Sequence, residues 1–405
     1  MDSGISAAAR ALSRADPLTA LKHVALRADP PALALRGIAM AQLGELANAR
    51  ALLRRAAGKF GAAEPVARAR CVVAQAEVAL ALRDLTGAEQ GLDAAATLLA
   101  HRGDAANAGF ARLVQVRRLT LLGAVEPAER ALGELSLPDA PPLLVALLNL
   151  AAADLAMKRI ASAGAEAALR RARAAATQAR IAPLLHEVEQ AEAQLRAPVA
   201  RALVGRRERP ISLHELPAVL ASGQLVVDAC RREARLGDHV VSLVTRPILL
   251  ELLIALAEAA PGDVARELLI ARVFGVRRGN DSHRVRLRVE VGRLRRLLTP
   301  LAGLRATAAG FELVARGGEC CVLLPPAAGE ASELLALLRG GEAWAASALA
   351  VAVGKSQRAV QRALRALEQD GKVRATGGGR ARRWVGLSSA GFSTSLLLIA
   401  PGALE

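Results

Sequence analysis

"LAVAVGKSQRAVQRALRALEQDGKVRATGGGRARRWV", residues 349–385, contains a Gly-Lys-Ser triplet followed by a glycine-rich basic segment. A nucleotide-binding loop has the pattern G-x-x-x-x-G-K-[ST] and lies between a strand and a helix. Position 349 is Leu where the first glycine is required, and the preceding "EAWAASALAVAV" is rich in Ala and favours a helix. The triplet therefore does not indicate a nucleotide site.

The same stretch fits two helices joined by a tight turn at Gly354. Glycine permits the positive φ of such a turn, and Ser356 is placed to cap the second helix. Val360, Leu364 and Leu367 recur at i, i+4 and i+7, so they predict the buried face of that helix. The segment "KVRATGGGRARRWV" then predicts a strand, a glycine-rich hairpin with a basic tip, and a second strand.

This order of elements resembles the winged helix-turn-helix of bacterial transcription regulators of the MarR or DeoR type. The resemblance implies binding of duplex DNA, and Arg and Gln are the side chains that make bidentate contacts with guanine and adenine. An amphipathic helix with a solvated Arg face is the alternative. The candidate DNA-binding residues of this region are Lys355, Ser356, Gln357, Arg358, Gln361, Arg362, Arg380 and Arg382.

A second region with a similar plan lies upstream. "QLVVDACRREARLGDHVVSLVTRP" predicts a small antiparallel sheet, and Pro247 suits the start of a helix through "ILLELLIALAEAA". Asp263 suits the cap of a helix in "VARELLIARVFG". The helix "RVRLRVEVGRLRRLL" and the hairpin "LRATAAGFELV", with Gly310 near its turn, complete the region.

Residues 224–316 resemble the DNA-binding domain of OmpR/PhoB-type regulators. Leu243 and Thr245, Phe274 with Gly275, "RLRRLL" at 293–298 and Thr307 occupy places that match that family's pattern. Phe274 replaces the usual Trp. The wing is shortened to Ala309, Gly310 and Phe311, a departure that bears on minor-groove contact.

Helical geometry separates the faces of the third helix in this region. Leu287, Val291, Leu294 and Leu298 should face the core, which places Val289, Arg293 and Arg296 on the opposite side. Arg293 is predicted to contact guanine and Val289 a thymine methyl, while Arg288 and Arg295 suit phosphates. A winged helix used for protein contact is the alternative. The candidate DNA-binding residues are Arg284, Arg286, Arg288, Val289, Arg293, Arg295 and Arg296.

Helical repeats are predicted for the N-terminal region. "ALALRGIAMAQLGELANARALLRRA", residues 32–56, alternates small and large residues and turns near Gly44. Similar segments follow at intervals of about 40 residues, and the pattern over residues 30–195 resembles tetratricopeptide repeats. Such repeats stack into a solenoid. Its surface could hold a protein or peptide partner or form a homodimer, and the sequence does not choose between these roles.

Composition narrows the function. The net charge is +16: residues 1–200 hold 24 basic and 19 acidic side chains, and residues 201–405 hold 30 and 19. With no Tyr and only five Phe and two Trp, a stacking platform for single-stranded nucleic acid is hard to build, so duplex binding is favoured. The four Cys and six His show no metal-ligand spacing, and no signal peptide or membrane span is indicated.

The sequence thus predicts a mainly α, cytoplasmic chain with a helical-repeat domain and two tandem α+β winged helices. The expected ranges are 1–200 for the repeats, 201–223 for a linker, 224–318 for the first winged helix, 319–329 for a linker, 330–388 for the second winged helix and 389–405 for a tail. The predicted function is sequence-specific binding of double-stranded DNA in transcription regulation, without catalysis, cofactor or metal. The alternative is a scaffold whose winged helices bind protein.

Overall fold

The computed structural model describes residues 2–62, 64–85, 91–136, 140–205, 207–276, 279–327, 329–339 and 342–387. The chain is mainly helical, as predicted, with 61% helix and 14% strand. It divides after Gln194 into two compact units, the second running from Leu195 to Leu387. The predicted tail, residues 389–405, lies outside the described residues. Within the described ranges, no helix combines the length and apolarity needed to span a bilayer.

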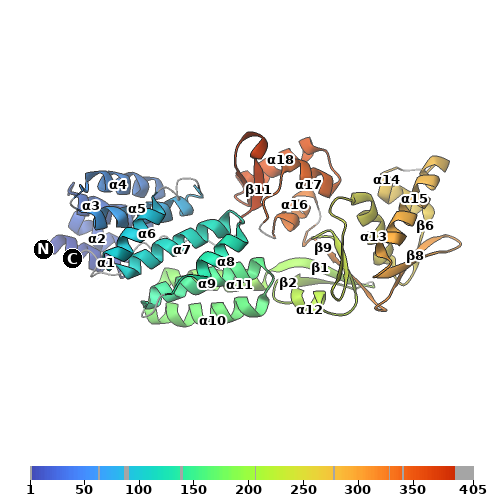
Figure 1. Ribbon diagram of the computed structural model, residues 1–405, viewed down its shortest axis with the longest axis horizontal. Coiled ribbons are helices and arrows are strands. Elements are labelled where there is room, and N and C mark those ends of the chain that lie inside the picture. The colour runs from blue at the N-terminus through green and yellow to red at the C-terminus, as the bar shows by residue number, and fades with distance from the viewer. Residues whose placement is uncertain are drawn as a thin grey trace. The chain divides into compact units, whose positions relative to one another are not determined.

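Helices follow one another through the first unit (Figure 1). They are α1 Ser3–Leu12, α2 Pro17–Val24, α3 Pro30–Gln42, α4 Leu46–Lys59, α5 Pro65–Ala81, α6 Leu92–His101, α7 Ala105–Leu121, α8 Val125–Gly133, α9 Pro142–Lys158, α10 Ser162–Ala179 and α11 Ala182–Arg196. The helix pairs expected from the sequence are α3 with α4, α5 with α6, α7 with α8, and α9 with α10. Each pair packs its two helices against one another.

One backbone turn recurs inside these four pairs. A residue with positive φ follows the first helix of each pair: Gly44 (85°), Arg83 (58°), Gly123 (74°) and Ile160 (60°). The N–H of the next residue donates to the carbonyl five positions earlier at 2.7 to 2.9 Å, which is the Schellman arrangement. Glycine adopts this conformation without steric cost, whereas Arg83 and Ile160 are strained in it. Only two of the four turns therefore carry a glycine signal in the sequence.

Close approach of α3 and α4 explains the small residues of the first pair. A Cβ added to Gly37 would lie 2.7 Å from Cγ of Leu53. Leu53 is fully buried, as are Ala49 and Ala56. A residue larger than glycine at position 37 would have to displace Leu53, so the alternation of small and large residues sets the helix spacing.

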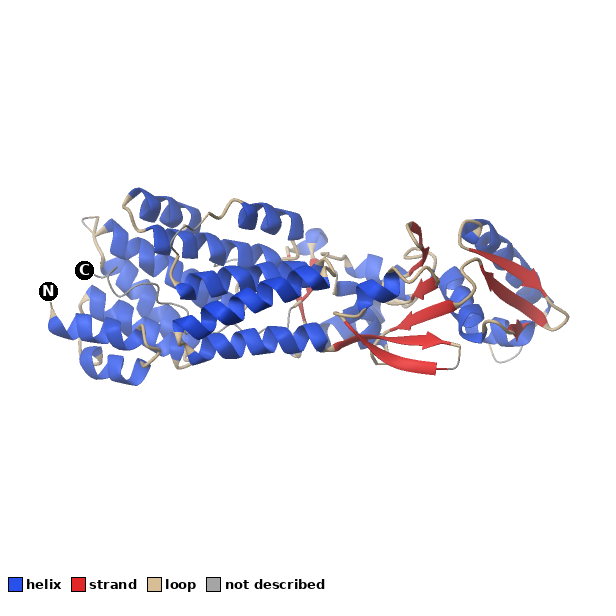
Figure 2. Ribbon diagram, turned by 90° about the horizontal axis from the view of Figure 1, so that it is seen from below, coloured by secondary structure: helices blue, strands red, loops and turns tan. Residues whose placement is uncertain are grey.

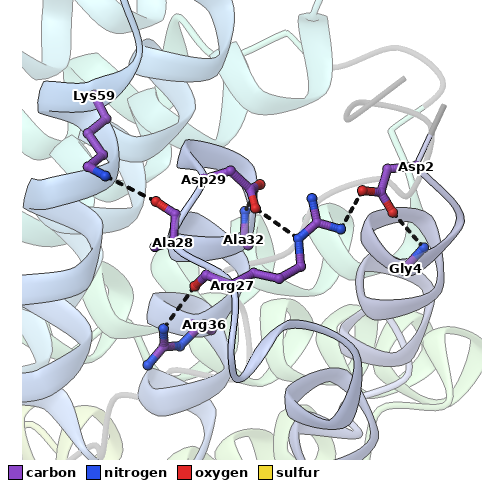
Figure 3. Close-up of polar contacts among 8 residues, drawn as sticks. All are labelled: Asp2, Gly4, Arg27, Ala28, Asp29, Ala32, Arg36 and Lys59. Carbon is purple, nitrogen blue, oxygen red and sulfur yellow. Dashed lines mark hydrogen bonds and ion pairs between the residues drawn. The ribbon is translucent and has the colours of Figure 1, made fainter.

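Polar contacts tie the turn before α3 to its neighbours (Figure 3). The Arg27 guanidinium donates to the carboxylate of Asp29 at 2.8 Å and also to that of Asp2. These contacts with Arg27 lower the pKa of both carboxyl groups. Lys59 of α4 donates to the carbonyl of Ala28 at 3.1 Å. The first two helices are thereby linked to the α3 and α4 pair.

A six-stranded sheet opens the second unit, where strands lie among helices (Figure 2). Its order is β2-β1-β9-β3-β4-β5, and the strands are β1 Pro198–Val204, β2 Arg207–Ser212, β3 Leu225–Asp228, β4 Glu233–Leu236, β5 His239–Ser242 and β9 Cys320–Leu324. β9 pairs antiparallel with β1 and parallel with β3. The sheet is therefore larger than the predicted one and mixed rather than purely antiparallel.

Both predicted linkers are wrong. Residues 201–223 contain most of β1, all of β2 and the short helix α12 (Leu216–Leu220), and residues 319–329 contain β9. Pro210 suggested a linker, yet it lies in β2, an edge strand, where a missing N–H is tolerated. β9 is almost wholly buried, and a strand covered on both faces reads as a continuous apolar run without alternation.

Three helices and a three-stranded sheet form the α13–β8 segment, residues 247–315. Its elements are α13 Pro247–Ala259, β6 Asp263–Ala265, α14 Arg266–Phe274, α15 Asp281–Leu298, β7 Ala302–Ala306 and β8 Gly310–Ala315, with sheet order β6-β8-β7. The helix expected after Pro247 is confirmed. Asp263 is not the cap of α14, because it lies in β6 opposite Glu312. A Cβ on Gly310 would lie 1.7 Å from the carbonyl oxygen of Val264, so only glycine fits there.

The α16–β11 segment, residues 330–387, repeats this plan. Its elements are α16 Glu330–Leu338, α17 Ala346–Val353, α18 Gln357–Gln369, β10 Val373–Thr376, a 3-10 turn Gly379–Ala381 and β11 Arg383–Gly386. Gly354 has φ of 66° in the turn before α18, as predicted. Ser356 caps α18, since its Oγ accepts the N–H of Ala359 at 3.2 Å. The predicted helix, turn, helix and hairpin are therefore present.

Candidate nucleic-acid interface

The outward side of α15 combines arginines with a short uncharged stripe. The predicted core residues are buried: Leu287, Val291, Leu294 and Leu298. On the opposite side Val289 is 48% exposed, and Val285, which the sequence reading overlooked, is 56% exposed. Gly292 continues the stripe, and a Cβ there would meet open space. The i, i+4 spacing from Val289 was the signal that could have identified Val285.

Two arginines near the start of α15 are oriented by neighbouring side chains. Arg284 forms ion pairs with Asp281 at 3.2 Å and with Glu267 of α14 at 3.5 Å. The guanidinium of Arg286 lies 4.7 Å from the ring centroid of Phe274, a cation–π contact. Both arginines remain exposed. Exposed ion pairs are weak, so a phosphate could replace these partners at small cost.

Arg293 and Arg296 line a groove of about 640 Å³ beside the start of α13. The groove is also lined by Arg246 and by Glu290. Nη1 of Arg293 lies 2.9 Å from Oε1 of Glu290, which is 8% exposed. Sequence reasoning assigned Arg293 to a base and missed Glu290, although an acid three residues before an arginine is a recognisable helical pair. Three guanidinium groups beside one carboxylate leave the groove with positive charge.

The remaining predicted phosphate ligands of α15 are arranged differently from one another. Arg288 and Arg295 are both exposed, and Arg295 also donates through Nε to the carbonyl of Leu304 in β7 at 3.1 Å. The turn between β7 and β8 is anchored to the start of α14, because Arg266 donates to the carbonyl of Thr307 at 3.0 Å. Arg295 thus links the hairpin to α15, and Arg266 links it to α14.

The polar face of α18 is open. Its core residues Val360, Leu364 and Leu367 are buried, as predicted. The predicted contact residues around them are exposed: Lys355, Ser356, Gln357, Arg358, Gln361 and Arg362. Gln357 and Gln361, one helical turn apart, line a groove of about 230 Å³ with Arg365 and Arg382. The hairpin residue Arg382 therefore lies beside the two amide side chains of α18.

The β10–β11 hairpin is held in place by contacts of Arg382 and Trp384. The Arg382 guanidinium lies 4.9 Å from the ring centroid of Trp384 and 3.8 Å from the carboxylate of Glu368. The backbones of Trp384 and Trp344 exchange hydrogen bonds of 2.7 and 2.8 Å. The side chain of Arg380, also predicted to contact DNA, lies outside the described residues.

The cysteines do not form a reactive site. Each of the four is a free thiol. Burial raises the pKa of Cys71, Cys230 and Cys320 to about 12 and that of Cys321 to about 11. Such thiols are protonated at neutral pH and poor nucleophiles. Among the described residues, no group of three or more His, Cys, Asp or Glu side chains could hold a metal ion.

α15 and α18 occupy equivalent places in their segments (Figure 1). Each is the third helix, and each follows a shorter helix that ends at a left-handed glycine: Gly275 with φ of 65° and Gly354 with φ of 66°. Each exposes basic side chains and precedes a β-hairpin. Such a surface can contact phosphates and base edges together. A scan against protein-family models and searches of curated proteins and of solved structures found nothing that matches this chain.

Proposed function

We propose that the chain is a non-catalytic regulator of transcription that binds double-stranded DNA in a sequence-specific manner. In this proposal residues 224–318 form a winged helix of the OmpR/PhoB type, and the α16–β11 segment forms a second one of the MarR or DeoR type. The observation that carries the proposal is the repeated arrangement of an exposed basic third helix between a glycine turn and a hairpin. The major groove of duplex DNA admits one such helix.

The two helices offer different chemistry to base edges. α15 exposes Val285 and Val289 among arginines, and α18 exposes Gln357 and Gln361 among arginines. Valine packs against the methyl group of thymine, glutamine pairs with adenine, and arginine pairs with guanine. The two segments should therefore recognise different short sequences.

We assign the helix pairs of the first unit a tetratricopeptide-like role in sensing, docking or dimerisation. Support comes from the shared turn at Gly44, Arg83, Gly123 and Ile160 and from the close packing of α3 on α4. Repeated helix pairs bury their faces by stacking and leave an extended surface for a protein or peptide.

A protein-binding scaffold is the second candidate. One observation favours it, namely that Leu268 of α14 is 65% exposed and Val285 of α15 is 56% exposed. Exposed apolar side chains on neighbouring helices are common at protein interfaces. Binding of this kind depends weakly on salt, whereas the logarithm of a DNA affinity falls linearly with the logarithm of salt concentration.

Selection from a random-sequence duplex pool tests the proposal with the full-length chain. We expect one enriched motif and a salt dependence that corresponds to several phosphate contacts. An unenriched pool, or equal binding to all duplexes, would contradict sequence-specific regulation.

Two double variants test whether DNA binding depends on where the positive charges lie or only on their number. Arg288→Ala with Arg296→Ala removes two exposed charges from α15, and Arg170→Ala with Arg180→Ala removes two exposed charges from the first unit. Only the first pair should weaken binding to the selected duplex substantially. Equal losses would mean that net charge alone drives binding.

A further inference from the structure

The start of α13 is contacted from two directions. Residues 245–249 line the groove that also contains Arg293 and Arg296 of α15. Gly354, in the turn before α18, packs on the same stretch, because a Cβ added there would lie 3.4 Å from Cβ of Pro247. The flank of α15 and the beginning of α18 are therefore separated by one short segment of chain.

Three further contacts hold the α16–β11 segment against the rest of the second unit. Val244, after β5, packs on the apolar core of that segment. Arg232, before β4, is 6% exposed and lies 3.7 Å from the carboxylate of Glu333 in α16. Arg339 donates to the carbonyl of Val199 in β1 at 2.7 Å. Because these contacts come from separate places on the sheet, they fix the orientation of α18 relative to α15 before a ligand binds.

We infer that α15 and α18 bind one duplex as a rigid pair, and that the arginine-lined groove between them holds phosphates of the same DNA. This inference rests on the proposed function and specifies its ligand. The ligand is a duplex that carries two different short sequence elements at one fixed spacing. Arg246 and Arg296 would contact the backbone between the two elements, while Arg293 at the edge of the groove reads a base.

The dimensions of the helices limit the length of each element. A helix rises about 1.5 Å per residue, so the stretches from Val289 to Arg293 and from Gln357 to Gln361 each span about 6 Å. This length is well below one turn of duplex, which is about 34 Å. Each element should therefore be only a few base pairs long.

Rigidity makes binding sensitive to spacing. Two linked binding sites reinforce one another only when both can engage at once. A pair whose orientation is fixed loses little freedom on binding the matching duplex, but it cannot adjust to a displaced element. A flexible tether between the segments would tolerate displacement.

The test uses duplexes recovered by selection with the full-length chain. Insertion of about five or about ten base pairs between the two elements, half a turn or one turn, should weaken binding at least about tenfold in each case. Recovered binding at ten base pairs would indicate a flexible tether and overturn the inference. A selected site with a single element would also overturn it, whereas a pool without enrichment would overturn the proposed function itself.

Variants at the contact provide the second arm. Val244→Asp places a charge against the core of the α16–β11 segment, and Glu333→Arg places like charges together opposite Arg232. With either change, the insertions should lower the affinity for the duplex by less than about threefold. Val240→Asp, on β5 and 46% exposed, is the control, and its affinity should fall as much as that of the wild type when base pairs are inserted. If the affinity of Val244→Asp and of Glu333→Arg falls as much too, the contacts do not set the spacing and the inference is wrong.

Discussion

Arg293 and Glu290 form an ion pair within α15, with 2.9 Å between Nη1 of the arginine and Oε1 of the glutamate. Glu290 is buried, whereas the Arg293 side chain is 57% exposed. The carboxylate therefore orients one edge of the guanidinium and leaves its other N–H groups toward solvent. Under the proposed function, an arginine held in this way is oriented for a base before the duplex binds.

Replacement of Arg293 tests that role. Arg293→Ala should cost about 1 to 3 kcal/mol on the selected duplex and relax the preference at one base pair, because a bidentate contact with guanine is lost. The measurement compares Kd values for the selected duplex and its single-base-pair variants. Equal losses on selected and random duplex would show that Arg293 does not read a base.

Arg288 should behave as a phosphate ligand. Arg288→Ala is expected to weaken binding to all duplexes alike and to lower the slope of log Kd against log salt by about one. Arg272→Ala is the control, since that arginine of α14 is held by Glu258 and Glu251. A salt slope that stays unchanged in Arg288→Ala would remove Arg288 from the interface.

Two glycines should respond in opposite ways to substitution by alanine. Gly292→Ala should raise the free energy of unfolding by about 1 kcal/mol, because a Cβ meets open space in the middle of α15. It should also weaken DNA binding by covering the exposed stripe. Gly354→Ala should lower the free energy of unfolding by about 1 to 2 kcal/mol, because φ is 66° there.

Fluorescence-detected unfolding reports these changes, since Trp344 and Trp384 both lie in the second unit. Duplex titrations measure the effect on binding. Unimpaired DNA binding by Gly292→Ala would place the DNA on another face of α15.

The exposed face of α18 should matter more than the lysine of the Gly-Lys-Ser triplet. Gln361→Ala with Arg362→Ala should impair binding to the selected duplex without unfolding the segment, because both side chains are exposed. Lys355→Ala should have the smaller effect. ATP binding that is lost in Lys355→Ala would instead support a nucleotide loop.

Buried Asp228 should make stability depend on pH. Burial raises the pKa of its carboxyl to about 6, although the carboxylate accepts the N–H of Arg231 at 2.9 Å. Because the folded-state pKa lies above the unfolded value of 3.8, the stabilising contribution is complete below that value and is lost as the pH rises through about 6. The difference of about two pH units corresponds to about 3 kcal/mol.

Asp228→Asn removes the ionisation and keeps an acceptor for Arg231. The variant should therefore gain stability over the wild type between pH 4 and pH 7 in denaturant unfolding. Glu215→Gln is a control of opposite sign, because hydrogen bonds from the backbone and hydroxyl of Ser212 lower the pKa of Glu215 to about 2. A variant-to-wild-type difference that is constant with pH would contradict the account of Asp228.

Local patterns predicted the two exposed helices well. The i, i+4, i+7 spacing of Val360, Leu364 and Leu367 gave the buried face of α18, and Gly354 with Ser356 gave its turn and cap. The turn at Arg83 was not signalled, because a non-glycine residue in the left-handed region owes its conformation to the surrounding packing.

The pairing of strands that lie far apart in the sequence was not predicted. Nothing near "CCVLL" indicates that β9 pairs with β1, since the partners Val204 and Cys321 lie far apart in the sequence. At the candidate site, the positions of single arginines followed from helical geometry. Their partners, such as Leu304 for Arg295, depend on how β7 packs on α15.

The place of β9 has a consequence for synthesis of the chain. β1 ends at Val204, and the strand that joins it to β3 begins only at Cys320, after the whole α13–β8 segment. During synthesis, the inner edges of β1 and β3 therefore stay unpaired until that segment has been made. Unpaired strand edges can form hydrogen bonds with strands of other chains. Nascent chains that stall before Leu324 should aggregate or need a chaperone, even though both edge strands and the four helices α12 to α15 have already been made.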